Sequence, residues 1–181
     1  MAAQNGAADP AKAGALAYLD EHAAEYADLA QRIWTLAEVG YQEHESSAAL
    51  QEKLRAAGFT VEAGVADIPT AFVASYGSGA PIIGILAEFD ALPGVSQEAV
   101  PYRKEREDCT AGHACGHHLF GAGSTAAAVA VKEWLAKSGA SGTIRLYGAP
   151  AEEGGSGKVY MVRAGLFDDA DVVLHWHPGD G

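Results

Sequence analysis

The stretch from Pro81 to Ala87 constrains the fold of this chain more than any other feature. It reads Pro-Ile-Ile-Gly-Ile-Leu-Ala, which is apolar almost without a break, as expected of a β-strand that is buried on both faces of its sheet. Glu88 and Asp90 follow at once, so this longest apolar run is too short to span a membrane. We therefore expect helices to cover the sheet to which this strand belongs.

The residues around this strand predict an α/β fold. Apolar residues recur at helical spacing in four segments and form strand-like runs in four others. The predicted helices cover residues 14–39, 45–57, 119–135 and 156–164, and the further strands cover residues 59–62, 71–76, 142–147 and 171–176. Gly40 is predicted to cap the first helix. The alternation of helix and strand in the second half predicts a mixed, largely parallel sheet flanked by helices.

The composition is that of one soluble globular domain, because the 181 residues are 49% hydrophobic and 20% charged. The net charge of −12 argues against binding of nucleic acid or of an anionic membrane surface. Residues 1–13 are Ala-rich and polar and do not resemble a signal peptide. We expect them to form a disordered tail before a folded part over residues 14–181. With only two cysteines, Cys109 and Cys115, the chain cannot have a disulfide framework of the kind found in small secreted proteins. We therefore expect a cytoplasmic location.

The segment from Gly112 to His118 reads Gly-His-Ala-Cys-Gly-His-His and carries the strongest chemical signal. Cysteine sulfur and imidazole nitrogen are preferred ligands of zinc and related metals. One Cys-x-His pair, Cys115 with His117, supplies only half of a coordination shell. The question is whether other segments supply the remaining donors.

Polar residues follow three of the predicted strands at the point where each ends. The carboxyl ends of strands form the binding crevice in open α/β sheets. Each of these groups alone could be an ordinary solvated turn or a buried polar residue, but their coincidence with the Cys-x-His pair predicts a metal site. The groups are Glu88 with Asp90, Glu152 with Glu153, and His175 with His177.

This donor set permits hydrolysis by a metal-bound water. Carboxylates, one thiolate and imidazoles together suit zinc, manganese or cobalt, and the site could hold one divalent ion or two. The reaction also needs a carboxylate that takes a proton from the water and passes it to the leaving nitrogen. Adjacent glutamates on a Gly-flanked turn, such as Glu152 and Glu153, can divide these tasks, one binding metal while its neighbour stays free as the base.

Four ordered motifs resemble the dinuclear-metal amidohydrolases, a superfamily that includes aminoacylases, glutamate carboxypeptidases and auxin-conjugate hydrolases. The resemblance runs from about the first helix to the end of the chain and implies a zinc-peptidase-like catalytic domain. Its substrates would be N-acyl or N-aroyl amino acids. The motifs are Ala-Glu-Phe-Asp-Ala-Leu-Pro-Gly (87–94), Gly-His-Ala-Cys-Gly-His (112–117), Ala-Pro-Ala-Glu-Glu-Gly-Gly-Ser-Gly-Lys (149–158) and Trp-His-Pro (176–178).

The resemblance also implies a role for each site residue. Cys115 would bridge two divalent metal ions, zinc or manganese with cobalt as a further option, and His117 and Glu153 would each be a ligand. Glu152 would be the general base, and Asp90 would support a ligand rather than bind metal. The position of the last ligand depends on the subfamily. We favour His177, the histidine directly before the proline. The auxin-conjugate hydrolases place this histidine two residues earlier, which would select His175. His118 stands where the amidohydrolases carry aspartate, which leaves the hydrogen-bond partner of the Cys-x-His pair open.

Members of this superfamily interrupt their catalytic domain with a lid domain through which they dimerise. The resemblance therefore implies that the chain ends before the lid, as the N-terminal part of a catalytic domain, and that a full-length form is dimeric. The chain alone would then hydrolyse little or no amide substrate. An alternative is a metal-binding or interaction domain that keeps the fold without catalysis. A more distant alternative is a structural domain with a redox thiol pair.

Overall fold

The computed structural model describes residues 10–179, which fold around one five-stranded mixed sheet. The strand order is β1-β2-β4-β3-β5, with β1–β2 and β2–β4 antiparallel and β3–β4 and β3–β5 parallel. This confirms the predicted mixed sheet flanked by helices. The strands are β1 (Thr60–Ala63), β2 (Phe72–Ser78), β3 (Ile82–Ala87), β4 (Gly142–Gly148) and β5 (Val172–Leu174), and the helices are α1 (Pro10–Leu36), α2 (His44–Ala56), the 3-10 turn η1 (Val65–Asp67), α3 (His117–Ser138), α4 (Glu152–Gly155) and α5 (Gly157–Arg163).

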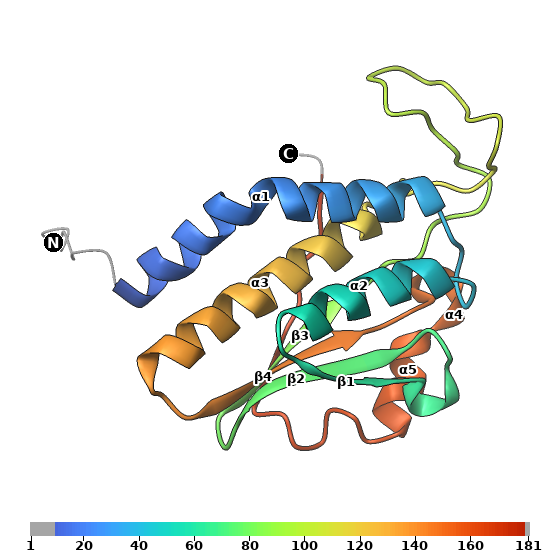
Figure 1. Ribbon diagram of the computed structural model, residues 1–181. Coiled ribbons are helices and arrows are strands. Elements are labelled where there is room, and N and C mark those ends of the chain that lie inside the picture. Colours follow the sequence, from blue (N-terminus) through green and yellow to red (C-terminus); the bar gives the residue numbers. More distant parts are fainter. Residues whose placement is uncertain (1–9, 180–181) are drawn as a thin grey trace, which may run out of the picture.

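Helices cover both faces of this sheet, as the apolar β3 requires. Helices α1, α2 and α3 lie over one face, and α5 lies on the other side with η1 beside it (Figure 1). Side chains alternate between the two faces along the strands. In β2, Phe72 and Ala74 join the core under α1–α3, whereas Val73 packs with Tyr147 and Met161 in the core under α5.

Helix α3 approaches the sheet closely because its buried face is made of small residues. Ala126, Ala128 and Val129 are buried there. A side chain at Gly121 would come within 2.9 Å of the backbone oxygen of Glu88. This close approach brings the start of α3 against the end of β3.

The first helix differs from its prediction at both ends. It begins at Pro10 instead of residue 14, and residues 1–9 of the expected tail lie outside the described residues. It ends at Leu36, because Ala37 takes a positive φ of 45° and stops the helix. Gly40 therefore does not cap it. Instead Gly40 lies against Ala151, whose Cβ would be 3.0 Å from a side chain at position 40.

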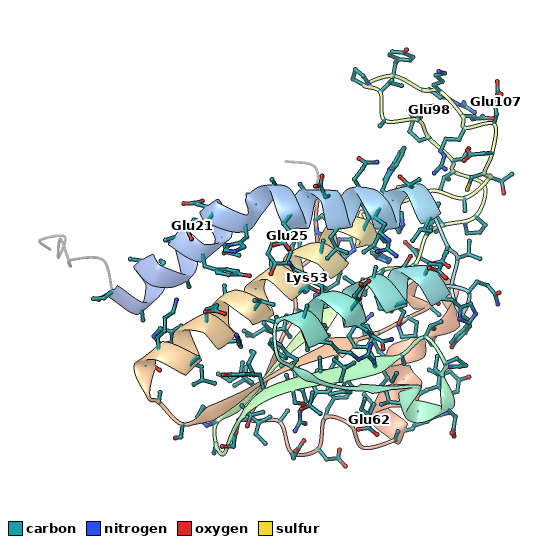
Figure 2. The ribbon with its side chains drawn as sticks, viewed as in Figure 1. Glu21, Glu25, Lys53, Glu62, Glu98 and Glu107 are labelled. Atoms are coloured by element: carbon teal, nitrogen blue, oxygen red, sulfur yellow. The ribbon has the colours of Figure 1, made fainter. Side chains whose placement is uncertain are left out.

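The long segment between β3 and α3 leaves the body of the domain as a projecting loop. Glu98 and Glu107 lie in this loop, well away from the sheet (Figure 2). Between α1 and α2, Lys53 of α2 forms an ion pair with Glu25 of α1 (Figure 2). Among residues 10–179, none of the helices combines the length and the apolar character needed to cross a membrane.

Candidate metal centre

The carboxyl ends of β3, β4 and β5 meet at one edge of the sheet because these three strands run parallel. Polar side chains follow each strand, and the start of α3 brings the Cys-x-His pair to the same place. Ligands bind at this edge in open α/β sheets. The side chains that gather there are Glu88 and Asp90 after β3, Glu152 and Glu153 in α4, His175 and His177 after β5, and Cys115 and His117 at the start of α3.

The His117 ring lies at the centre of this cluster and is fully buried. Its Nδ1 is 2.9 Å from Oδ1 of Asp90 and 3.0 Å from the backbone oxygen of Asp90. These acceptors hold a proton on Nδ1 and leave Nε2 as the atom that can bind a metal ion. Nε2 is 3.0 Å from Oε2 of Glu88 and 3.9 Å from both Oε2 of Glu152 and Oε1 of Glu153.

Three buried polar atoms in this cluster have no hydrogen-bond partner among the described residues. They are Nε2 of His117, Oε2 of Glu88 and Oε1 of Glu153. Nε2 of His117 and Oε2 of Glu88 form an ion pair at 3.0 Å when the ring is protonated. All three atoms nevertheless lack an aligned hydrogen bond, which is unusual for buried polar groups in proteins. A bound cation would satisfy all three, and nitrogen and carboxylate oxygen are suitable donors for a divalent transition metal. The cluster therefore fits a metal ion.

His177 and His175 lie in different surroundings. Nε2 of His177 is 3.4 Å from Sγ of Cys115, and the His177 ring is 5.5 Å from the ring of His117. The ligand atoms of these three residues all lie within 4.8 Å of one another. His175 instead stands against Phe120, with its Nε2 3.5 Å from Oε1 of Glu88. The geometry thus brings His177, and not His175, to the Cys-x-His pair.

Buried charges in the cluster shift its pKa values strongly. Burial raises the pKa of Glu88, but His117 and Lys158 outweigh burial and lower it to about 2. Burial lowers the pKa of His117, but Asp90 and Glu88 outweigh burial and raise it to about 10. Burial and the neighbouring Glu153 raise the pKa of Cys115 to about 11. The thiol of Cys115 and the ring of His117 must therefore each lose a proton when they become metal ligands.

The turn that carries Glu152 and Glu153 is fixed by contacts from distant segments. Ala151, directly before it, takes a left-handed conformation with φ of 55°. Its backbone N–H donates to Oε1 of Glu43 at 2.8 Å, and the backbone N–H of Glu153 donates to Oδ2 of Asp90 at 2.9 Å. The Tyr41 hydroxyl donates to the backbone oxygen of Gly155. Asp90 therefore contacts both His117 and the backbone of Glu153.

The segment that carries His177 is held against α3. The indole Nε1 of Trp176 donates to Oγ of Ser124 at 3.0 Å. A side chain at Gly123 would come within 2.8 Å of the Trp176 ring, and one at Gly116 would come within 2.7 Å of Pro178. Gly116 also has a φ of 81°, which favours glycine. These glycines let the segment lie flat on the start of α3.

The sequence pattern predicts no role in the site for two residues that contact it, Glu43 and Lys158. Glu43 is fully buried, but it stands in a polar connection between two helices and looks like a solvated acid. Lys158, whose ammonium group forms an ion pair with the buried Glu88, lies in a matched motif but in no metal-binding pattern. Both act through contacts that only the folded chain creates.

His118 does not contact the Cys-x-His pair as a hydrogen-bond partner. The partner of His117 is Asp90, whereas the His118 ring lies 5.0 Å from the ring of His113. Burial lowers the pKa of both His113 and His118 to about 4, so both are neutral near pH 7. The two cysteines are free thiols, and Sγ of Cys109 donates to the backbone oxygen of Ala111.

The sequence of this chain is similar to those of known hydrolases. It is 49% identical over 154 residues to one of the subunits of p-aminobenzoyl-glutamate hydrolase from Escherichia coli (strain K12), an alignment that covers 84% of this chain and 32% of that relative. It is 31% identical over 155 residues to hippurate hydrolase of Campylobacter jejuni subsp. jejuni, which covers 84% of this chain and 39% of that relative. The chain thus spans 32% to 39% of the length of these two curated relatives.

The fold also matches a solved structure, that of a dinuclear metal binding peptidase of the M20 family from Bacillus subtilis. The TM-score is 0.68 at 24% identity, over 86% of this chain and 44% of that chain. This likeness confirms the predicted zinc-peptidase-like fold. The sequence pattern of Peptidase family M20/M25/M40 matches residues 84–181. Because that match covers more than half of the chain and all four motifs, this protein belongs to Peptidase family M20/M25/M40.

Proposed function

We propose that this chain forms the metal-binding part of a hydrolase that cleaves the amide bond of N-acyl or N-aroyl amino acids, of the p-aminobenzoyl-glutamate type. The observation that carries the proposal is the group of buried, unpartnered atoms of Glu88, His117 and Glu153 at the carboxyl ends of parallel strands. The names of two relatives support the substrate class, since p-aminobenzoyl-glutamate and hippurate are both N-aroyl amino acids. The Escherichia coli relative is named as one of two kinds of subunit, which supports assembly of this chain with a different partner chain.

The proposed ligands of two divalent ions are Cys115, His117, Glu153 and His177, with Cys115 as the bridging donor. Zinc or manganese suits this set best, and cobalt can replace them. Asp90 would act as a positioning residue, because it holds both the His117 ring and the backbone of Glu153. The placement of His175 beside Phe120 and Glu88 supports His177 as the ligand. We also propose a cytoplasmic location.

Glu152 is the proposed general base. Its side chain is 42% exposed and lies 3.9 Å from Nε2 of His117, so it can reach both substrate and solvent. Bound divalent ions would supply a water of lowered pKa and would polarise the amide carbonyl. The Glu152 carboxylate would take the proton from that water and give it to the leaving nitrogen. The left-handed Ala151 and its bond to Glu43 would hold Glu152 in position.

Substitution of Glu152 tests this function. In the natural protein that carries this sequence, Glu152→Gln should abolish most turnover of p-aminobenzoyl-glutamate while the metal content stays unchanged. Glu62→Gln, an exposed residue on β1, is the matched control and should keep full turnover. Unchanged turnover in Glu152→Gln would reject the base assignment. A wild-type protein that binds no divalent metal would reject the function as a whole.

A further inference from the structure

A pocket of about 560 Å³ lies where η1, α5 and the connection between α1 and α2 come together. Helix α5 packs against η1 on the face of the sheet opposite α1–α3 (Figure 1). None of the residues that line the pocket is a proposed metal ligand or the proposed base. The lining residues are Tyr41, Ala66, Asp67, Ile68, Pro69 and Tyr160.

Two tyrosine side chains line this pocket from different elements. Tyr41 lies in the connection between α1 and α2 and is 37% exposed, and Tyr160 lies on α5 and is 47% exposed. The Tyr41 hydroxyl donates to the backbone oxygen of Gly155, which anchors this ring at the end of α4. Burial raises the pKa of Tyr41, and the neighbouring Tyr160 and Glu43 raise it further, so the phenol is uncharged at neutral pH. The face of a neutral tyrosine ring attracts cations.

Asp67 adds a negative charge to the same pocket. Its carboxylate has neither an ion pair nor a hydrogen bond within residues 10–179. Ala66 and Asp67 both have a left-handed backbone, with φ of 56° and 58°. This conformation is costly for residues other than glycine, and such residues cluster at sites that clamp ligands. The strained turn therefore presents an unpaired acid in a pocket that two aromatic side chains also line.

We propose that this pocket binds an organic ammonium ion, which the rings of Tyr41 and Tyr160 and the carboxylate of Asp67 attract together. A hard inorganic cation requires several oxygen ligands, whereas an alkylated ammonium ion is recognised by aromatic rings and one acid. The volume of the pocket suits a small molecule. The net charge of −12 also attracts cations to the protein. The inference goes beyond the proposed function and does not depend on it.

Titration of choline into the purified chain tests the proposal. Choline carries a quaternary ammonium group, and the alcohol in which carbon replaces its nitrogen has the same shape without the charge. The NMR signal of the ligand methyl protons reports binding, because protons over an aromatic ring shift upfield. We expect choline to bind at least about tenfold more tightly than the uncharged alcohol. Equal affinities, or no binding of choline, would overturn the proposal.

Substitutions in the pocket locate the bound cation. Tyr160→Leu should weaken choline binding by about tenfold, whereas Tyr160→Phe keeps the ring and should bind choline like wild type. Asp67→Asn removes the charge and should also weaken binding. The matched controls, Tyr102→Leu at a residue that is 63% exposed and Asp20→Asn on the exposed face of α1, should bind choline like wild type.

The half-exposed Tyr160 and the exposed Asp67 lie outside the buried core, and circular dichroism checks that each variant folds like wild type. If Tyr160→Leu and Asp67→Asn both bind choline with wild-type affinity, the cation binds elsewhere and the assignment of this pocket is wrong. The titration requires neither a bound metal nor turnover. Failure of this inference is therefore distinguishable from failure of the proposed function.

Discussion

Oε1 of Glu43 accepts a hydrogen bond from the backbone N–H of Ala151 at 2.8 Å, across 108 residues of chain. The Glu43 side chain is fully buried, and its other oxygen accepts a hydrogen bond from the Thr70 hydroxyl at 3.1 Å. Ala151 has a left-handed backbone and directly precedes Glu152. The connection between α1 and α2 therefore holds the turn that carries the proposed base and one proposed ligand.

Removal of this carboxylate should destabilise the fold. Glu43→Ala leaves the Ala151 N–H and the Thr70 hydroxyl unpaired in a buried place, which costs about 1–3 kcal/mol for each donor. Urea unfolding measures the loss, and Glu52→Ala, at a side chain that is 79% exposed, is the control with an expected change below about 0.5 kcal/mol. Equal losses in the two variants would contradict a role for the buried contacts.

Glu43 should also make stability depend on pH. Burial raises the pKa of Glu43 above its ordinary value of 4.5, and the charge of Asp90 raises it further, against the backbone hydrogen bonds that lower it. A raised pKa means that the folded state binds the proton on Glu43 more tightly than the unfolded state does. The resulting contribution to the free energy of unfolding is fully present below pH 4.5 and is lost as the pH rises through the pKa of the folded state.

The difference in unfolding free energy between wild type and Glu43→Gln isolates this effect. Glutamine cannot titrate, so wild type should lose stability relative to the variant as the pH rises from about 4.5 towards neutrality. Urea unfolding of both proteins across this range measures the change. If the difference in unfolding free energy between the two proteins stays constant with pH, Glu43 does not titrate in this pH range.

Asp90 should control metal affinity without binding metal. Asp90→Asn keeps the size of the side chain but replaces one of two acceptors with an N–H₂ group. Either the Glu153 N–H then loses its partner, or the His117 ring loses its side-chain acceptor and keeps only the backbone oxygen of Asp90. We expect metal affinity to fall by about 10- to 100-fold, as for other partners of metal ligands. Calorimetric titration with zinc measures this, with Asp20→Asn on the exposed face of α1 as the control. An unchanged affinity in Asp90→Asn would remove its positioning role.

Gly123 should be needed for the placement of His177. The Cβ of Gly123→Ala would lie 2.8 Å from the Trp176 ring, which must move and take the adjacent His177 with it. We expect weaker cobalt binding and an altered cobalt spectrum. Gly14→Ala in α1 is the matched control, because a side chain there meets nothing within 4 Å and should stabilise the helix by about 0.5–1 kcal/mol. If both variants bind cobalt like wild type, Trp176 does not set the position of His177.

Much of the fold could be predicted from the local pattern of residues. The apolar β3 with its acidic end, the helical spacing in α2 and the alternation of helix and strand after α3 defined an α/β sheet covered by helices. Local patterns predicted the ends of helices less well than their existence. Helix α1 stops at Ala37 through a backbone conformation that side-chain periodicity does not encode, and so the cap expected at Gly40 was wrong.

The sequence by itself determined which segments carry donor atoms, because each motif stands where a strand ends or a helix begins. Only the tertiary structure decided which atoms meet. β4 pairs with β3, which brings Glu153 to Asp90, and the close approach of α3 to the end of β3 brings His117 to the same carboxylate. Contacts such as Glu43 with Ala151, and Glu88 with Lys158, join residues far apart in the chain, and no local pattern specifies them. These contacts form because the fold buries the carboxylates of Glu43 and Glu88. A buried carboxylate cannot be solvated by water and needs partners from the protein.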